Sequence, residues 1–189
     1  MMMRWTIAGA GALALGLLTL HVPLPWASAS QNAQGSPAST STACAANGKA
    51  ADLHFTLKDL DNKPVTLSDF KGKVIVLDFW ATWCGPCKLE IPGFITMQNT
   101  YGAQGLQTIG ISVDDKLEDL KPYAAEYKMN YPVLQGRDHD DVQDAFGPIF
   151  GIPTTIVIGR DGKICRKHEG LTGRDSFERE IKALLAQQM

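Results

Sequence analysis

Neither a strong charge of one sign nor a long apolar run occurs in the sequence. Its 189 residues include 18 Lys and Arg against 20 Asp and Glu, for a formal net charge of −2 at pH 7. Because nucleic-acid-binding proteins need a basic surface, this balance predicts no nucleic-acid partner. The apolar run from Ile7 to Leu20 falls short of the ~20 residues that a membrane-spanning helix needs. These two scarcities exclude a nucleic-acid-binding role and argue against a spanning helix.

Cysteine and histidine are also scarce, at four residues each. Four cysteines are too few for a small fold held together by disulfides, whereas 44% hydrophobic residues can build an ordinary core. Cys84 and Cys87 have the spacing of half a zinc site, but a structural zinc site usually needs four ligands. The histidines stand singly, at His21, His54, His139 and His168. We therefore expect no metal site, and we expect the last three histidines on the surface without a role.

The first 49 residues indicate targeting and linker sequence. In residues 1–29, Arg4 precedes the apolar run and Ala27-Ser28-Ala29 offers small residues for cleavage, as in a signal peptide. We favour a cleaved signal over an uncleaved anchor, and either would place the protein in the periplasm or elsewhere outside the cytoplasm. Residues 30–49, rich in Ser, Ala and Thr, predict a flexible linker. Residues 50–189 then form one domain.

The chemistry centres on Cys84 and Cys87, which separate a buried strand from a helix. The nearly continuous apolar run over residues 74–80 predicts a central strand. The helix is expected from about Cys87 to Tyr101, with Pro86 in its first turn. Unpaired N–H groups and the helix dipole at this end favour a thiolate. We therefore expect Cys84 to be a nucleophile that forms a reversible disulfide with Cys87.

Strands and helices alternate along the rest of the chain and end in a hairpin. Alternating apolar residues from Leu53, a turn at residues 61–62 and a return at 65–67 predict a β-hairpin before this core. Asp161-Gly162 predicts a second hairpin. The other elements are expected as strands at 107–113, 131–134, 152–158 and 163–168, and as helices at 117–129, 142–146 and 175–187. This order predicts an α/β fold with a mixed sheet flanked by helices.

Residues 77–88 resemble the active-site stretch of the thioredoxin superfamily. Further segments are similar to its TlpA/ResA branch of extracytoplasmic thiol-disulfide oxidoreductases, which carry a redoxin or AhpC/TSA-like domain. These segments are residues 55–61, 67–73, 90–92 and 151–155. The resemblance covers roughly residues 50 to 186. It implies a thioredoxin-like fold with an N-terminal β-hairpin extension.

The resemblance also implies roles for residues beside the cysteines. Pro153 is expected to follow a cis bond after Ile152 and to lie beside the cysteine pair, although the alternative is a proline that ends strand pairing. Glu90 follows Cys87 by three residues and so shares its helix face. It would tune the thiols and move protons, or else be a solvated surface carboxylate.

Asp78 is a carboxylate within an apolar strand, which is costly unless it has a function. In thioredoxins a buried Asp at the matching position accepts the proton of the second Cys, but many members of the TlpA/ResA branch carry Asn there. Asp78, Glu90 or both could therefore move the proton. The alternative is an Asp at an exposed edge or in a structural hydrogen bond. Trp80 is expected in the core, and substrate contacts are expected at Trp83, Gly85, Pro86 and Ile152.

Cys44 and Cys165 remain after the C-x-x-C pair is assigned. Because free thiols are uncommon in oxidising compartments, we predict a structural disulfide between them. The alternative is two free thiols.

The resemblance implies a protein-disulfide reductase with no cofactor beyond its own cysteine pair. Its substrates would be protein disulfides, such as cysteine pairs of apocytochrome c or of a copper-delivery protein. Its electrons would come from a membrane thiol-transfer protein of the CcdA or DsbD type, and we expect a monomer. Two alternatives stay open, namely a peroxiredoxin-like thiol peroxidase and a copper-binding or chaperone module. A peroxidatic Cys usually follows a Pro and a Thr, whereas residues 78–80 here are Asp-Phe-Trp.

Overall fold

The computed structural model describes Cys44 and residues 48–187, with a five-stranded mixed sheet at its centre in the order β5-β4-β3-β6-β7. The middle strand β3 (Val74–Trp80) runs parallel to β4 (Leu106–Ser112) and antiparallel to β6 (Thr154–Ile158). The edge strands are β5 (Val133–Gln135) beside β4 and β7 (Ile164–Glu169) beside β6. All residues of β3 are buried, as in a strand covered on both faces.

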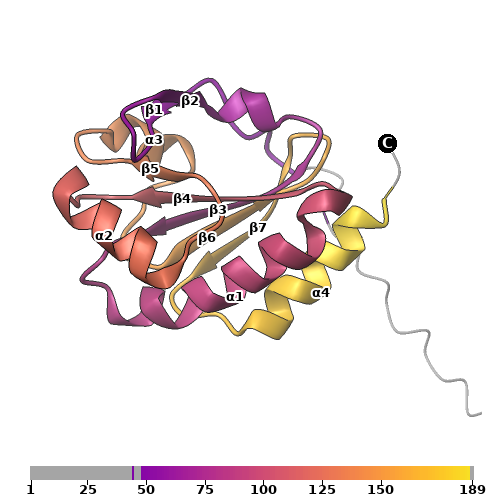
Figure 1. The fold of residues 1–189 in the computed structure, drawn as a ribbon. Coiled ribbons are helices and arrows are strands. Elements are labelled where there is room, and N and C mark those ends of the chain that lie inside the picture. The colour runs from indigo at the N-terminus through magenta and orange to yellow at the C-terminus, as the bar shows by residue number, and fades with distance from the viewer. Residues whose placement is uncertain (1–43, 45–47, 188–189) are drawn as a thin grey trace, which may run out of the picture. The chain divides into compact units, whose positions relative to one another are not determined.

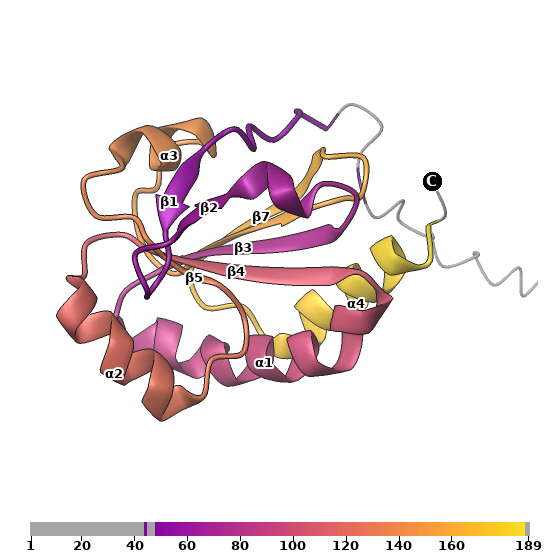
Figure 2. The same ribbon diagram turned by 45° about the horizontal axis from the view of Figure 1, so that its top comes forward.

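Helices cover one face of the sheet, and α1 (Gly85–Tyr101) and α4 (Arg174–Leu185) lie side by side there (Figures 1 and 2). α2 (Leu117–Tyr127) covers the same face, and the 3-10 turn η2 (Gly102–Gln104) follows α1. The other face carries α3 (Asp140–Ala145) and the predicted N-terminal hairpin. That hairpin consists of β1 (Thr56–Lys58), β2 (Pro64–Thr66) and the 3-10 turn η1 (Leu67–Phe70). The mixed sheet between helical layers confirms the predicted thioredoxin-like fold.

The core divides into two clusters because successive β3 side chains point to opposite faces of the sheet. Val74, Val76 and Trp80 pack under the helices. Ile75, Leu77 and Phe79 pack on the other side, against the N-terminal hairpin and α3. This alternation places Asp78 on the helix-covered face, beneath α1.

The element boundaries follow the predictions closely, with two differences that affect the site. α1 begins at Gly85 rather than near Cys87, because the side chain of Cys84 caps the helix. β6 begins at Thr154 rather than Ile152, because the Ile152–Pro153 bond is cis and Pro153 has no N–H to donate to a strand.

The chain before the hairpin is described only in part. The expected targeting segment, and the expected linker apart from Cys44, Gly48 and Lys49, fall outside the described residues. Lys49–Ala51 lies along the β6–β7 hairpin: the Ala51 N–H donates to the Gly162 carbonyl, and the Ile164 N–H donates to that of Lys49. Over Cys44 and residues 48–187, no helix has the length and apolarity to cross a membrane.

Candidate redox-active site

The cysteine pair lies where β3 ends and α1 begins. Cys84 and Cys87 form a disulfide with their Cα atoms 5.3 Å apart. The Cys87 N–H donates to Cys84 Sγ at 3.2 Å, so this sulfur already occupies the anion-favouring end of the helix. After reduction, the same position favours a thiolate at Cys84.

A network around Asp115 holds the loop that precedes the cysteines. The Thr82 N–H and hydroxyl both donate to its carboxylate, at 2.7 and 2.6 Å, and the Ser112 hydroxyl donates to it at 2.6 Å. The next residue, Trp83, is 63% exposed, and its Nε1 donates to Asp114 Oδ1 at 3.0 Å. The turn after β4 therefore anchors the loop. The sequence alone does not reveal this role, because the two segments are far apart in the chain.

Access to the sulfur atoms is narrow. Cys84 is only 4% exposed and Cys87 only 1%, whereas Trp83, Gly85 and Pro86 are exposed around them. An incoming disulfide must therefore approach along the surface that these neighbours form.

The loop before β6 brings a cis proline to the same end of the sheet. Thr154 is the register partner of Phe79, so Pro153 lies beside the end of β3, from which the cysteine loop departs. Pro153 is buried, and the cis bond after Ile152 is the one that the resemblance implied. The alternative of a simple strand-ending proline does not account for this geometry.

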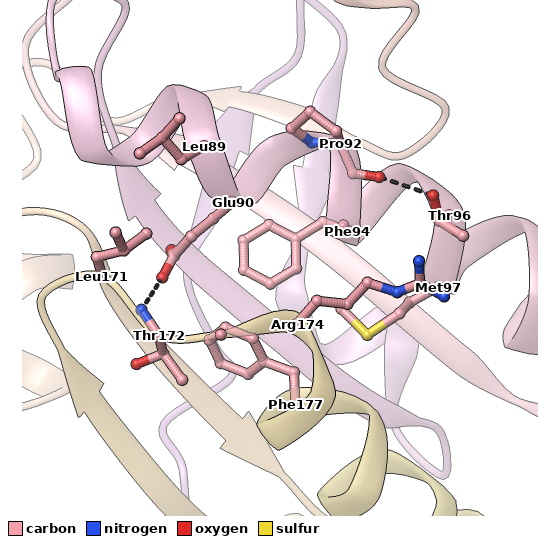
Figure 3. Close-up of a pocket in the computed structure, with 12 residues that line it drawn as sticks. Leu89, Glu90, Pro92, Phe94, Thr96, Met97, Leu171, Thr172, Arg174 and Phe177 are labelled. Carbon is pink, nitrogen blue, oxygen red and sulfur yellow. Dashed lines mark hydrogen bonds between the residues drawn. The ribbon is translucent and has the colours of Figure 1, made fainter.

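Glu90 lies on α1, one turn beyond Cys87, and its side chain points toward the chain between β7 and α4 (Figure 3). Its residue exposure is 6%, so the alternative of a solvated surface carboxylate is wrong. Oε1 accepts a hydrogen bond from the Thr172 N–H, and the buried Oε2 has no partner among the described residues. Burial raises the Glu90 pKa to about 7, against the lowering effects of the Thr172 hydrogen bond and the charge of His168.

A cavity of 520 Å³ opens beside this carboxyl, between α1 and α4 (Figure 3). Its lining includes Leu89 and Leu171, which are 69% and 55% exposed, together with Phe94 and Phe177. Glu90 therefore combines a buried carboxyl with a nearby opening to solvent.

Asp78 is 1% exposed on the central strand, so the alternative of an exposed edge position is wrong. The Thr155 hydroxyl donates to its Oδ1 at 3.2 Å. Burial and the charge of Glu90 raise the Asp78 pKa well above its usual range, and the Thr155 hydrogen bond opposes that shift. Two electrostatically coupled carboxyls thus lie on the two elements that flank the cysteine pair, Asp78 on β3 and Glu90 on α1.

His168 was expected on the surface, and this expectation is wrong. Its side chain is only 17% exposed, and Nε2 lies 2.9 Å from Glu180 Oε2. His168 pairs with Thr155, the register partner of Asp78, and therefore faces the helices. A bulge between Val157 and Ile158 breaks the alternation along β7, so the residue pattern of this strand does not reveal that placement. His54 and His139 have side-chain exposures of 84% and 41%, as expected of surface residues.

Further polar atoms are buried near Asp78. Trp80 Nε1 and the Tyr131 hydroxyl have no hydrogen-bond partner among the described residues. The rings of both residues lie over Gly110, the β4 register partner of Asp78, where a Cβ atom would come within 2.8 Å of Trp80 Nε1 and 3.5 Å of Tyr131 Cε2. Gly110 therefore makes room for the indole.

A second disulfide joins Cys44 to Cys165, which are separated by 121 positions. A Cβ atom at Gly159 would lie within 3.2 Å of both sulfur atoms, so the bond lies at the β6–β7 turn. Because Ile158 pairs with Ile75 at the start of β3, this disulfide and the C-x-x-C pair lie at opposite ends of the central strands. Within Cys44 and residues 48–187, no group of three or more His, Cys, Asp or Glu side chains could hold a metal ion.

The fold and the site together define a thioredoxin-like protein whose C-x-x-C disulfide caps a helix beside a cis proline. Residues 47–167 match the AhpC/TSA family. The chain is 30% identical over 137 residues to the thiol-disulfide oxidoreductase ResA of Bacillus thuringiensis subsp. konkukian. The aligned region covers 72% of this chain and 78% of the relative. The chain therefore belongs to the AhpC/TSA family, among the thiol-disulfide oxidoreductases related to ResA.

Solved structures agree with this assignment. A thiol:disulfide interchange protein of the thioredoxin family from Chlorobium tepidum is similar with a TM-score of 0.68 at 32% identity, over 76% of this chain and 100% of that one. A thiol:disulfide interchange protein from Bacteroides sp. is similar with a TM-score of 0.64 at 33% identity, over 75% of this chain and 91% of that one.

Proposed function

We propose that this protein is an extracytoplasmic protein-disulfide reductase that works through the Cys84–Cys87 dithiol. The observation that carries the proposal is a disulfide at the amino end of a helix, with two buried carboxyls of raised pKa, one on that helix and one on the strand before it. A helix start stabilises the attacking thiolate, and a nearby base allows the second thiol to ionise.

The reaction starts from the reduced pair. The Cys84 thiolate attacks a substrate disulfide, so that a bond forms between Cys84 and one substrate sulfur while the second substrate sulfur leaves as a thiolate. Cys87 then loses its proton and attacks Cys84 Sγ, which closes the disulfide and releases the first substrate sulfur. Two electrons pass from the cysteine pair to the substrate, whose two thiolates take up protons.

Glu90 is suited to accept the proton of Cys87. A base works best when its pKa lies near the working pH, and the Glu90 pKa is raised to about 7. The 520 Å³ cavity beside Glu90 lets the proton pass on to solvent. Asp78 lies deeper, and its charge state modulates both Glu90 and the thiols.

The surface around the cysteines is suited to a polypeptide substrate. Trp83 is 63% exposed and Phe150, in the loop before the cis proline, is 90% exposed. Exposed aromatic side chains of this kind commonly mark protein contacts. The backbone of Ile152 lies in the same loop, before β6 begins, and is free of the sheet to pair with an extended substrate segment.

The finer assignments follow from the resemblance to the TlpA/ResA branch. We assign cysteine pairs of apocytochrome c or of a copper-delivery protein as substrates, and a membrane thiol-transfer protein of the CcdA or DsbD type as electron donor. The protein would act as a monomer outside the cytoplasm, with no cofactor beyond its cysteines.

Trapping tests the proposal directly. In the reduced protein, Cys87→Ser should hold substrates as mixed disulfides on Cys84, whereas Cys84→Ser should capture none. Mass spectrometry of extracytoplasmic extracts would identify the trapped cysteines. A Cys87→Ser protein that captures no disulfide-containing protein would contradict the proposed activity.

A thiol peroxidase is the second candidate, because the matching family is the AhpC/TSA family. Peroxide consumption by the reduced wild-type protein distinguishes the two. The reductase proposal expects insulin reduction without appreciable peroxide turnover. Copper chaperone activity would instead give tight Cu(I) binding without insulin reduction.

A further inference from the structure

A row of register partners crosses the helix-covered face of the sheet beneath α1. His168 in β7 pairs with Thr155 in β6, and Thr155 pairs with Asp78 in β3. The row shares the face of the core cluster under the helices, because Val157 and Val76, two positions away on their strands, belong to that cluster. The Thr155 hydroxyl donates to Asp78, so His168 lies one strand beyond the hydrogen-bond partner of the buried carboxyl.

The imidazole of His168 is held from two sides. Nε2 lies 2.9 Å from Glu180 Oε2 on α4. The ring stands edge-on to Phe177, with ring centroids 4.9 Å apart. Phe177 packs against Phe94 at 5.2 Å, and Phe94 lies one turn beyond Glu90 on α1. This stack fixes the imidazole on the sheet side of the helix that carries Glu90.

Charged groups approach Glu90 from several elements. Asp78 on β3 is the nearby carboxyl, His168 on β7 contributes a positive charge when protonated, and Arg174 on α4 lines the cavity beside Glu90. Arg174 is directed to Glu178, with 3.5 Å between its NH2 group and Oε2. The Cys84 and Cys87 sulfur atoms become further anions when the pair is reduced and ionised.

His168 has its own charged neighbours. Glu180 Oε2 lies 2.9 Å from His168 Nε2, and its other carboxylate oxygen lies 3.9 Å from Arg166 Nε. Arg166, Arg179 and Glu180 line a second cavity of 330 Å³ with His168. Thr172 lines both cavities, and its N–H donates to Glu90. Thr172 thus links the cavity that His168 lines to the cavity that Glu90 lines.

We propose that His168, anchored by Glu180, is a positioning residue of the redox site whose imidazolium sets the pH range over which Glu90 exchanges its proton. The inference rests on the proposed role of Glu90 as proton acceptor for Cys87. A protonated His168 stabilises the ionised carboxylate of Glu90, so its charge opposes the effect of burial. Loss of that charge must keep Glu90 protonated to higher pH.

The test compares substitutions that differ in charge. His168→Gln removes the cation, His168→Arg keeps it, and His139→Gln is a control at an exposed site on the other side of the sheet. The midpoint of Glu90 protonation is measured by NMR of the ¹³C-labelled carboxyl in the oxidised protein. His168→Gln should raise the midpoint by about 0.5–1 pH unit, whereas His168→Arg should leave it at or below the wild-type value. The control should not move it.

A purely structural role for His168 would move the midpoint equally in the Gln and Arg variants, and either that result or no shift in His168→Gln overturns the inference. His168→Asn and His168→Lys repeat the comparison if the first pair fails to fold, as judged by circular dichroism. The pH profile of insulin reduction should move with the NMR midpoint. A wild-type protein that reduces no disulfide would refute the proposed function, whereas the NMR comparison decides the role of His168 separately.

Discussion

The two disulfides of this protein are the same bond in opposite surroundings. Cys84 and Cys87 are three positions apart at the amino end of α1, beside a cis proline, with buried carboxyls on α1 and on β3. Cys44 and Cys165 are 121 positions apart and lie at the turn at the other end of the central strands. The exposed carboxyl of Asp161 lies beside that turn.

We propose that the surroundings of each disulfide, rather than the bond itself, determine which of the two exchanges. Exchange needs a stabilised thiolate and a base for the second thiol, and only the site at the start of α1 places both together among the described residues. A bond that closes a long loop instead restricts the unfolded chain. We therefore propose a structural role for Cys44–Cys165, and each prediction below tests this division of roles.

The largest effect should come from Cys84→Ser. Reduction of insulin should fall to the assay background, because no other thiol of the described chain lies at a helix start. The free energy of unfolding should change little, since the loop lost is very short. Residual activity that depends on Cys165 would contradict the assignment of all disulfide exchange to the Cys84–Cys87 pair. The Cys84→Ser/Cys165→Ser double variant checks for such activity.

Removal of the other disulfide should do the opposite. Cys44→Ser combined with Cys165→Ser should lower the free energy of unfolding by about 4 kcal/mol, because the bond closes a loop of more than a hundred residues. Insulin reduction at 25 °C should stay at the wild-type rate. Urea unfolding monitored by fluorescence measures the first quantity, and a loss of activity without loss of stability would contradict the assignment.

Glu90→Gln should stabilise the protein at alkaline pH. The carboxyl has a folded pKa of about 7 against an ordinary value of 4.5, so the folded state binds more protons than the unfolded state between these values. The free energy of unfolding must then fall as the pH rises from 4.5 to 7. At pH 8 the variant should exceed the wild type by about 3 kcal/mol, a difference that should disappear near pH 4.5.

The same substitution should flatten the neutral limb of the pH profile of insulin reduction, while the fold stays intact. Equal stability differences at pH 5 and pH 8 would show that Glu90 is ionised at both and would refute the raised pKa.

Asp78→Asn should have a smaller effect that is confined to the active-site pair. Asp78 becomes negatively charged only above its raised pKa, and Asp78→Asn removes that charge. In that alkaline range the Cys87 thiolate is then favoured, so Cys87 should become alkylated at a lower pH than in the wild type. Reduction of the Cys44–Cys165 bond by dithiothreitol should be unaffected, which makes it an internal control. A shift seen in Glu90→Gln but absent in Asp78→Asn would assign the coupling to Glu90 alone.

Local features of the site were predictable from the sequence. The apolar run at residues 74–80 coincides with β3, because burial on both faces leaves a continuous pattern. The place of Cys84 at the helix start follows from its short distance to Pro86. The pairing of Cys44 with Cys165 was reached by elimination, which could not indicate where in the fold the bond lies.

Contacts between segments that are far apart in the chain were not predictable from the sequence. The buried Glu90 carboxyl accepts a hydrogen bond from the backbone N–H of Thr172, 82 positions away, and a backbone donor cannot be identified from residue type. His168 is covered because α4 crosses β7 and brings Glu180 and Phe177 to it. Both facts arise from the packing of α4, which the helical pattern alone does not orient.

The pH dependence of Cys84 alkylation tests the central claim most directly. In reduced Cys44→Ser/Cys165→Ser protein, iodoacetamide labelling mapped by mass spectrometry reports how readily each remaining thiol ionises. The account predicts that Cys84 is modified rapidly well below pH 8.5, about the value at which an ordinary free thiol is half ionised. Labelling of Cys84 only at the pH of an ordinary thiol, with no dithiol exchange by the pair, would contradict it.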